Sequence, residues 1–282
     1  MTRGKKLLVA LGVVVVVLGG LAWWITRGTP AQHTVEQLSG RDPVLVEAQT
    51  ETVPSVSIAE PVGWAANEAP KPAAGLEVVR FAEGLEHPRT LLVLPNGDVI
   101  VALTRSPPGK GGGITGMIAG WLMGRAGATG PSPDTLMLLR DGDGDGKAEQ
   151  RFVLRKGNGL NSPSGLAWHG DKLYVANHDA VLAFDYKPGE TALAGAPTKL
   201  MDLPAGGGHW MRNLLVSADG KTLFVAVGSA SNIGENGMEI EAGRAAIWEL
   251  NLETRRARQF ANGLRNANGM DWNPSTGELW TV

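Results

Sequence analysis

The first apolar stretch of the chain is long and unbroken. Residues 7–25 carry no charge, and three glycines are their only weak helix formers. A run of this length is about enough to cross the ~30 Å hydrocarbon core of a bilayer as one helix. Because Arg3, Lys5 and Lys6 precede it, the positive-inside rule places the N-terminus in the cytoplasm. We therefore expect residues 1–27 to be a single-pass anchor in the cell inner membrane, with the rest of the chain on the periplasmic side; a cleaved signal peptide is the alternative.

The following region lacks a clear period. Residues 28–75 are rich in Thr, Val, Glu, Ala and Pro, and prolines at 54, 61, 70 and 72 interrupt any long element. We expect this segment to be a linker that holds the next domain away from the bilayer.

From residue 76 to residue 282 short apolar runs recur in pairs joined by a glycine turn. The turns lie at residues 97, 170, 220 and 277, and Asn96-Gly97 and Asp219-Gly220 are strong hairpin signals. A second pair of apolar runs follows each of the first three turns, at intervals near the ~50 residues of a propeller blade. The pattern predicts strands at 91–94, 99–102, 136–139, 151–154, 165–168, 173–176, 181–184, 199–203, 214–216, 223–226, 246–250, 257–260, 269–272 and 279–282.

This pattern predicts an all-β propeller domain over 76–282, with about four blades in the sequence. The Gly- and Pro-rich segment 106–133 is an insertion, and its apolar part, 114–123, is either a short helix over a mouth of the domain or a surface loop. Because the last predicted strand should lie inside a blade, we expect the sequence to continue in a longer protein.

Composition narrows the possible partners and chemistries. Lys and Arg number 26 against 28 Asp and Glu, which argues against a protein that binds nucleic acid through phosphates. The absence of cysteine excludes disulfides, thiolate zinc sites, iron–sulfur clusters and a cysteine nucleophile. The 39 glycines and 17 prolines favour short strands and many turns over long helices.

A glycine-rich segment directly before a predicted strand carries a candidate general base. His209 follows three glycines, in a place where a propeller sets loops around the mouth of its channel. A neutral imidazole there can accept a proton at working pH, although a histidine bonded to nearby backbone is the structural alternative. The remaining histidines lack this setting and are interpreted as structural or exposed: His33, His87, His169 and His178.

Two further groups of polar residues lie at strand ends. Asp141, Asp143 and Asp145 alternate with glycines as in a calcium loop. Phe152 stands at the position where such a loop needs a bidentate carboxylate, although Glu149 could supply that carboxylate instead. The alternative is a turn that binds no ion. Loops from different blades converge at a channel mouth, so we also expect two polar groups to face it. These groups are 229–232 and Arg265-Asn266.

Several phrases together resemble the L-sorbosone dehydrogenase family, which is related to the soluble pyrroloquinoline quinone (PQQ) glucose dehydrogenases. The resemblance spans about residues 76–282 and implies a six-bladed propeller with PQQ across the channel and calcium bound to the quinone. It implies oxidation of a sugar, an aldose or a sorbosone-like alcohol or aldehyde hydrate, with an electron acceptor that the sequence does not identify. The phrases that carry it are 138–146, 159–167, 173–177, 227–237 and 243–249.

The resemblance also implies roles for individual residues. His209 matches the base that takes the substrate proton while hydride passes to PQQ, and Arg265 is the second residue with a catalytic role. Four residues are expected to contact PQQ: Arg265, Asn266, Leu160 and Asn161. In the glucose enzymes a carboxylate supports the histidine, whereas the matching strand end here offers Ser229. Two alternatives stay open: a non-catalytic propeller that binds a ligand or protein, and a calcium-dependent hydrolase of the lactonase type.

Overall fold

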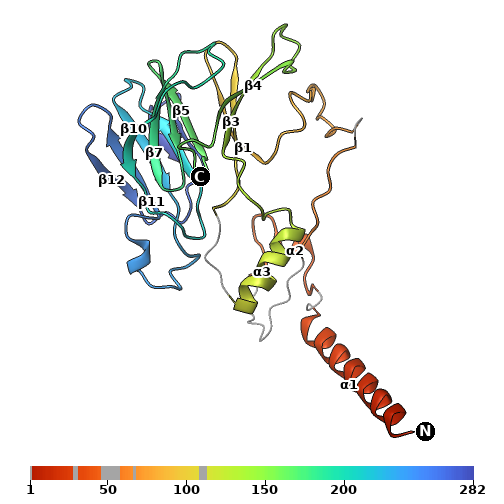
Figure 1. The fold of residues 1–282 in the computed structure, drawn as a ribbon. Helices are drawn as coiled ribbons and strands as arrows, with labels where there is room; N and C mark the ends of the chain where they lie inside the picture. Colours follow the sequence, from red (N-terminus) through yellow and green to blue (C-terminus); the bar gives the residue numbers. More distant parts are fainter. Residues whose placement is uncertain (1, 28–30, 46–57, 66–67, 108–112) are drawn as a thin grey trace. The chain divides into compact units, whose positions relative to one another are not determined.

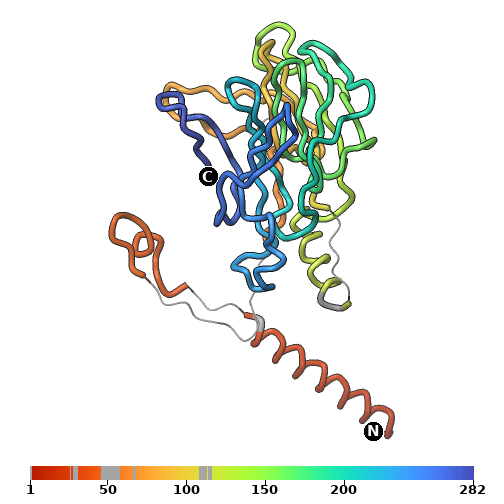
Figure 2. Tube along the Cα trace, turned by 90° about the vertical axis from the view of Figure 1, so that its left-hand side faces the viewer, coloured from red at the N-terminus to blue at the C-terminus, as the bar shows by residue number. Residues whose placement is uncertain are grey.

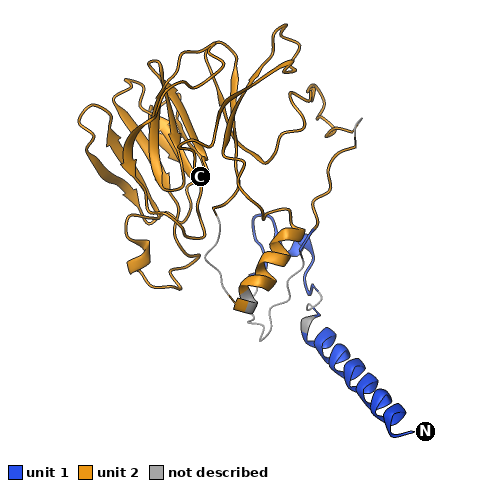
Figure 3. Cartoon of the chain, viewed as in Figure 1, with its two compact units in different colours: residues 1–59 blue, residues 60–282 orange. Residues whose placement is uncertain are grey.

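The computed structural model describes residues 2–27, 31–45, 58–65, 68–107 and 113–282 (Figure 1, Figure 2). The chain divides into two compact units, residues 1–59 and residues 60–282 (Figure 3). Residues 60–75, which the sequence analysis assigns to the linker, are thus grouped with the second unit.

The first unit contains the long apolar helix. Helix α1 (Arg3–Thr26) has a mean hydropathy of 2.5 over its apolar window, and its side chains are exposed. Its length and composition suit a membrane anchor and a signal sequence equally well. A second, short helix, α2 (Val35–Leu38), begins with a capping box in which Thr34 and Gln37 bond each other's backbone amides at 3.0 and 3.4 Å.

The second unit is built from antiparallel sheets in sequential strand order, which confirms the all-β prediction. Its described residues form three four-stranded sheets, here called blades 1 to 3, and one two-stranded pair (Figure 1). Every strand predicted from the apolar pattern is confirmed, and the insertion contains helix α3 (Gly113–Arg125). The number of blades in a complete ring stays a prediction. Blade 1 is β1 (Pro88–Val93), β2 (Val99–Leu103), β3 (Thr135–Arg140) and β4 (Gln150–Lys156); blade 2 is β5 (Gly165–His169), β6 (Lys172–Ala176), β7 (Ala180–Asp185) and β8 (Thr198–Asp202); blade 3 is β9 (Arg212–Val216), β10 (Thr222–Val227), β11 (Ala246–Asn251) and β12 (Ala257–Asn262); the pair is β13 (Met270–Trp272) and β14 (Leu279–Thr281).

The blades stack face to face because their central strands are apolar on both sides. Along β6, Leu173 and Val175 belong to a core cluster shared with blade 1, whereas Tyr174 and Ala176 belong to one shared with blade 3. Successive side chains of a strand point to opposite faces, so a continuous apolar run covers both. This explains why these strands show no alternation of polar and apolar residues in the sequence.

The first strands of neighbouring blades lie side by side, β1 against β5, β5 against β9 and β9 against β13. Polar contacts link them near their beginnings. Thr90 Oγ1 donates to Ser164 O at 2.6 Å, and Arg212 N donates to Ser164 Oγ at 2.8 Å. Asn213 Nδ2 donates to Ala267 O at 3.3 Å. The beginnings of these inner strands are therefore held in a fixed arc.

Because the strands of each blade are antiparallel, their connections lie at two opposite ends of the strands, which we call the loop edge and the turn edge. The loop edge carries 104–134, 157–164, 177–179, 203–211, 228–245 and 263–269, and the turn edge carries 94–98, 141–149, 170–171, 186–197, 217–221, 252–256 and 273–278. Both α3 and the short helix η1 (Glu239–Glu241) extend from the loop edge, at the bottom of Figure 1.

Candidate functional site

His209 lies on the loop edge, in the segment that leads into the inner strand β9. Its Nδ1 is 2.9 Å from Ser229 Oγ and 3.1 Å from Ser229 O. The Ser229 hydroxyl donates its proton to Ser231 O at 2.6 Å, so it can only accept at the imidazole. Nδ1 therefore carries the hydrogen, and Nε2, to which no described residue donates, is the proton-accepting nitrogen. The serine predicted to stand beside the histidine does so.

Gly228 brings His209 close to the next blade. A Cβ placed on Gly228 would lie 2.5 Å from His209 Cβ and 2.6 Å from Asn266 Oδ1, distances that no side chain can occupy. Only glycine thus allows both His209 and Asn266 to approach this strand end so closely. The structure brings together His209 and Asn266, which are distant in the sequence.

Arg265 joins the same group through the backbone and through its side chain. Ser229 N donates to Arg265 O at 2.8 Å, while the exposed guanidinium bonds Asn232, with Nε 3.1 Å from its carbonyl oxygen. A hollow of about 230 Å³ lies here, lined by Ser229, Ser231, Asn232, Ile233, Gly234, Met238, Glu241, Ala245, Gly263, Leu264 and Arg265. Ser229, Ser231, Asn232 and Arg265, from the two predicted polar groups, therefore share one concave surface.

A buried arginine fixes the backbone of the His209 segment. The Arg212 side chain is fully buried and donates to the carbonyls of His209 at 3.0 Å, Met211 at 3.0 Å and Pro204 at 2.8 Å. Burial, and then the nearby charge of Arg244, lowers the pKa of Arg212 to about 10, so it stays charged at neutral pH. Sequence reasoning missed this residue because nothing in the pattern marks its distant carbonyl partners.

Arg244 and Glu241 hold the two loops that meet at His209. Arg244 donates to Gly206 O at 3.0 Å and to Ala205 O at 2.6 Å, at the start of the glycine-rich segment. Glu241 accepts the backbone amides of Ala230 at 2.7 Å and Ser231 at 2.9 Å. The hydroxyl of Ser231, followed by these amides, lowers the pKa of Glu241. Neither residue was assigned a role from the sequence, although Arg244 lies in a phrase that carries the family resemblance.

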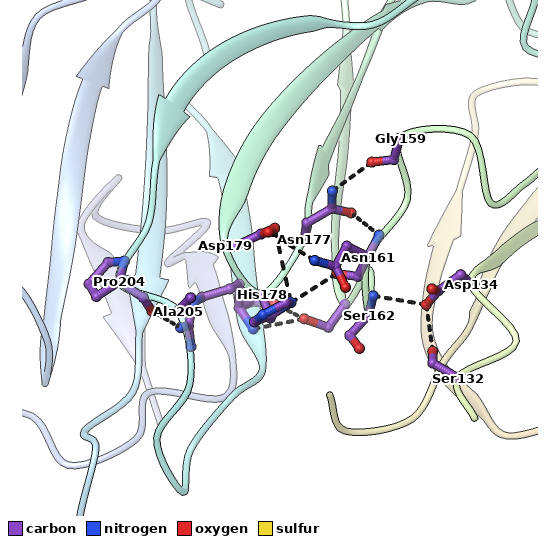
Figure 4. A network of polar contacts seen from close by, with 12 residues as sticks. Ser132, Asp134, Gly159, Asn161, Ser162, Asn177, His178, Asp179, Pro204 and Ala205 are labelled. Atoms are coloured by element: carbon purple, nitrogen blue, oxygen red, sulfur yellow. Dashed lines mark hydrogen bonds and ion pairs between the residues drawn. The ribbon is translucent and has the colours of Figure 1, made fainter. Parts of the chain in front are cut away.

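Asn161 lies on the loop edge of blade 2, in a polar network that Figure 4 shows together with Pro204 and Ala205. Its Nδ2 donates to Asp179 Oδ2 at 2.8 Å, its amide donates to Asn177 Oδ1 at 3.1 Å, and His178 approaches its carbonyl oxygen. Leu160 packs in the core shared by blades 1 and 2. No described contact links Asn161 or Leu160 directly to His209. His178 is buried and bonded to backbone, which agrees with its structural interpretation.

The acidic turn lies on the turn edge, away from His209. Ligand atoms of Asp141, Asp143, Asp145 and Glu149 lie within 4.8 Å of one another, an arrangement that could hold a metal ion. Asp141 accepts the amides of Gly144 at 2.6 Å and Gly146 at 2.9 Å, which lowers the pKa of its carboxyl. The structure thus places Glu149, and not Phe152, with the three aspartates.

Comparison with known proteins gives a family and a fold. A family model described as TrAA12-like matches residues 135–282. The iodide structure of Trichoderma reesei Carbohydrate-Active Enzymes Family AA12 is similar at 21% identity and a TM-score of 0.56, over 76% of this chain and 49% of that one. The holo form of the pyranose dehydrogenase PQQ domain from Coprinopsis cinerea is similar at 18% identity and a TM-score of 0.56, over 75% and 48%. The chain spans about half the length of these structures, and no curated protein matches it.

Proposed function

Because the chain belongs to the TrAA12-like family, we propose that it is part of a PQQ-dependent dehydrogenase that oxidises a sugar or a related alcohol. One observation carries the proposal: His209 has its Nδ1 satisfied by Ser229 and its Nε2 unbonded by the described residues, beside Arg265 and Asn266. The named function of a structural neighbour, a pyranose dehydrogenase PQQ domain, supports the same activity.

In this proposal His209 is the general base. Oxidation of an alcohol to a carbonyl removes two electrons and two hydrogens, and Nε2 of His209 takes the hydroxyl proton. The imidazolium that forms is stabilised by Ser229, whose carbonyl and hydroxyl oxygens both accept from Nδ1. A serine stabilises that charge less than a carboxylate does, so we expect a weaker base than in the glucose enzymes.

The residues present at this mouth fit PQQ by their chemistry. PQQ carries carboxylates and quinone oxygens, for which an exposed guanidinium and a carboxamide are suitable partners. Arg265 and Asn266 would hold it, with Asn161 and the backbone near Leu160 contributing from blade 2 once the site is complete. When bound, PQQ supplies the two-electron acceptor for the reaction.

Calcium enters the proposal at two places. The family resemblance implies one calcium ion at the quinone, and we assign no described residue to it. A second, structural ion would bind Asp141, Asp143 and Asp145, with Glu149 as the fourth carboxylate, because their oxygens already converge. Its place on the turn edge gives it a role in stability and none in the reaction.

We also propose that α1 stays in the cell inner membrane as an anchor, with the propeller on the periplasmic side. The support is the group of Arg3, Lys5 and Lys6 at the start of the helix and the uncharged run of residues 7–25 that follows it. The substrate is a small molecule, and the electron acceptor is unassigned.

A cofactor titration tests the proposed function. The product of the complete open reading frame, stripped with a chelator, is titrated with PQQ by absorbance with and without calcium, and dye reduction is then measured with aldoses and L-sorbosone. We expect saturable, calcium-dependent binding and dye reduction, with weaker binding in Arg265→Met and unchanged binding in the turn-edge control Arg256→Met. Binding without turnover would favour the ligand-binding alternative, and the absence of binding would overturn the proposal.

A further inference from the structure

Helix α3 is an apolar helix without an apolar core around it. Its sequence contains no acidic residue, and its large side chains are exposed: Met117 by 72%, Trp121 by 62% and Ile118 by 53%. A helix in a water-soluble domain ordinarily buries its apolar face and presents a polar one. An exposed apolar patch of this kind marks an interaction surface.

The segment around α3 is basic as well as apolar. Residues 104–133 contain no Asp or Glu, whereas Arg105, Lys110 and Arg125 are basic. Arg125 lies in the last turn with its guanidinium 5.5 Å from the Trp121 ring centroid, and it pairs with Glu60 at 2.6 Å. Tryptophan and arginine together suit the interface between lipid headgroups and acyl chains.

The length of α3 decides how it could meet a bilayer. Thirteen residues at ~1.5 Å each give about 20 Å, which is too short to cross a ~30 Å hydrocarbon core. A helix too short to span can contact a bilayer only at its surface, where the exposed apolar side chains of α3 would meet the lipid.

The chain supplies two further reasons to choose a bilayer as the partner. The β10–β11 loop exposes Ile233 by 90% and Met238 by 75% on the same loop edge, so apolar side chains come from two insertions. If α1 is retained as an anchor, the residues between α1 and Glu60 reach at most about 120 Å when fully extended, which limits how far the second unit can move from the bilayer.

We infer that α3, together with Ile233 and Met238 from another loop of the same edge, docks on the surface of an anionic lipid bilayer. The loop edge, which carries His209, then faces the membrane. This inference goes beyond the proposed dehydrogenase function, because lipid contact by α3 requires neither PQQ nor a substrate.

Single labels test the inference directly, because the chain contains no cysteine and each introduced thiol is unique. An environment-sensitive fluorophore is placed at Ile118→Cys and, as the matched control, at Glu253→Cys, which is exposed on the turn edge. The full chain is reconstituted into vesicles of phosphatidylcholine and phosphatidylglycerol. Quenching by a nitroxide attached to the lipid chains is compared with quenching by iodide in the water. Thermal unfolding of both variants checks that they are folded.

We expect lipid nitroxide to quench the Ile118 label several-fold more than the Glu253 label, with the reverse order for iodide. Introducing Met117→Glu should reduce lipid quenching at position 118. Equal quenching at the two positions would overturn the inference. A label at position 118 that neither quencher reaches would also overturn the inference, because this result indicates contact with another protein or with a second copy of this chain. Loss of PQQ binding in the earlier titration would leave this result unaffected.

Discussion

The two edges of the blades are held together in different ways. On the turn edge most hydrogen bonds close within one short turn, as between Ser217 and Thr222 or between Asn251 and Arg256. On the loop edge they join residues far apart in the chain. Arg244 reaches Gly206 across 38 positions, and Arg265 reaches Asn232 across 33.

This difference separates the parts of the fold that are encoded locally from those that require assembly. A turn whose partners lie within six residues can form by itself, whereas the His209 group exists only when neighbouring blades are in place. The proposed chemistry is therefore concentrated where the structure depends on distant contacts.

The largest effect is expected at the proposed base. His209→Gln keeps a polar side chain but removes the proton acceptor, so kcat/KM for dye reduction should fall by about 10²- to 10⁴-fold. The matched variant is His169→Gln, because His169 ends β5 on the turn edge. Activity is measured on the PQQ-loaded product of the complete reading frame. A similar loss in both variants would show that the effect is structural.

The next effect concerns the buried arginine of the loop edge. Arg212→Met leaves three carbonyl oxygens without their donor, and we expect the free energy of unfolding to fall by about 3 kcal/mol. The exposed Arg256 on the turn edge gives the control, Arg256→Met, with a change within about 0.5 kcal/mol. Urea unfolding of the chain measures both. Equal values for the two variants would contradict the role assigned to Arg212.

The turn edge also has contacts between distant residues, and the pair of Asp98 and Arg140 sharpens the comparison. Asp98 is buried and accepts from Arg140 at 2.6 and 2.7 Å, and this hydrogen bond lowers the pKa of Asp98 below 3.8. Asp98→Asn should lower the free energy of unfolding by about 2 kcal/mol at neutral pH, because a hydrogen bond to a charged group is lost while Arg140 keeps partial access to water.

The pH dependence of this pair has a definite sign. Because the folded carboxyl has the lower pKa, the pair stabilises the protein above pH 3.8, and the stabilisation is lost as pH falls through the folded pKa. Melting temperatures of the parent and of Asp98→Asn should therefore converge in acid. Curves that stay parallel would exclude an ionised Asp98 as the source of the difference.

The smallest effect is expected from calcium at the acidic turn. Calcium at tenfold above its dissociation constant should raise the free energy of unfolding by about 1.4 kcal/mol after chelator treatment. Asp143→Asn should abolish this gain, whereas Asp219→Asn, in another turn on the same edge, should retain it. Thermal unfolding with and without calcium measures this increase in stability. If calcium still stabilises Asp143→Asn, the ion binds at another site.

The sequence predicted the strands well because each blade is encoded by local apolar runs and glycine turns. The strand pairs around Asn96-Gly97 and Asp219-Gly220 are examples, since turn residue and register lie within a few positions. His209, Arg265 and Asn266 were proposed from their places at strand ends and from the family resemblance, which also placed Ser229 beside His209. Their supports were not found: the carbonyls that Arg212 and Arg244 bond carry no signal of residue type, because any residue supplies a carbonyl.

The sequential order of strands within each blade has a consequence for the kinetics of folding. Each blade can pair its strands soon after its own segment has been synthesised, because the pairings are antiparallel and close in sequence. The link from Ser164 to Arg212 forms only when blade 3 docks on blade 2. A partly synthesised chain can thus contain finished sheets and still lack the His209 group. The appearance of activity would then report when the blades dock on one another, which happens after the β-sheets have formed.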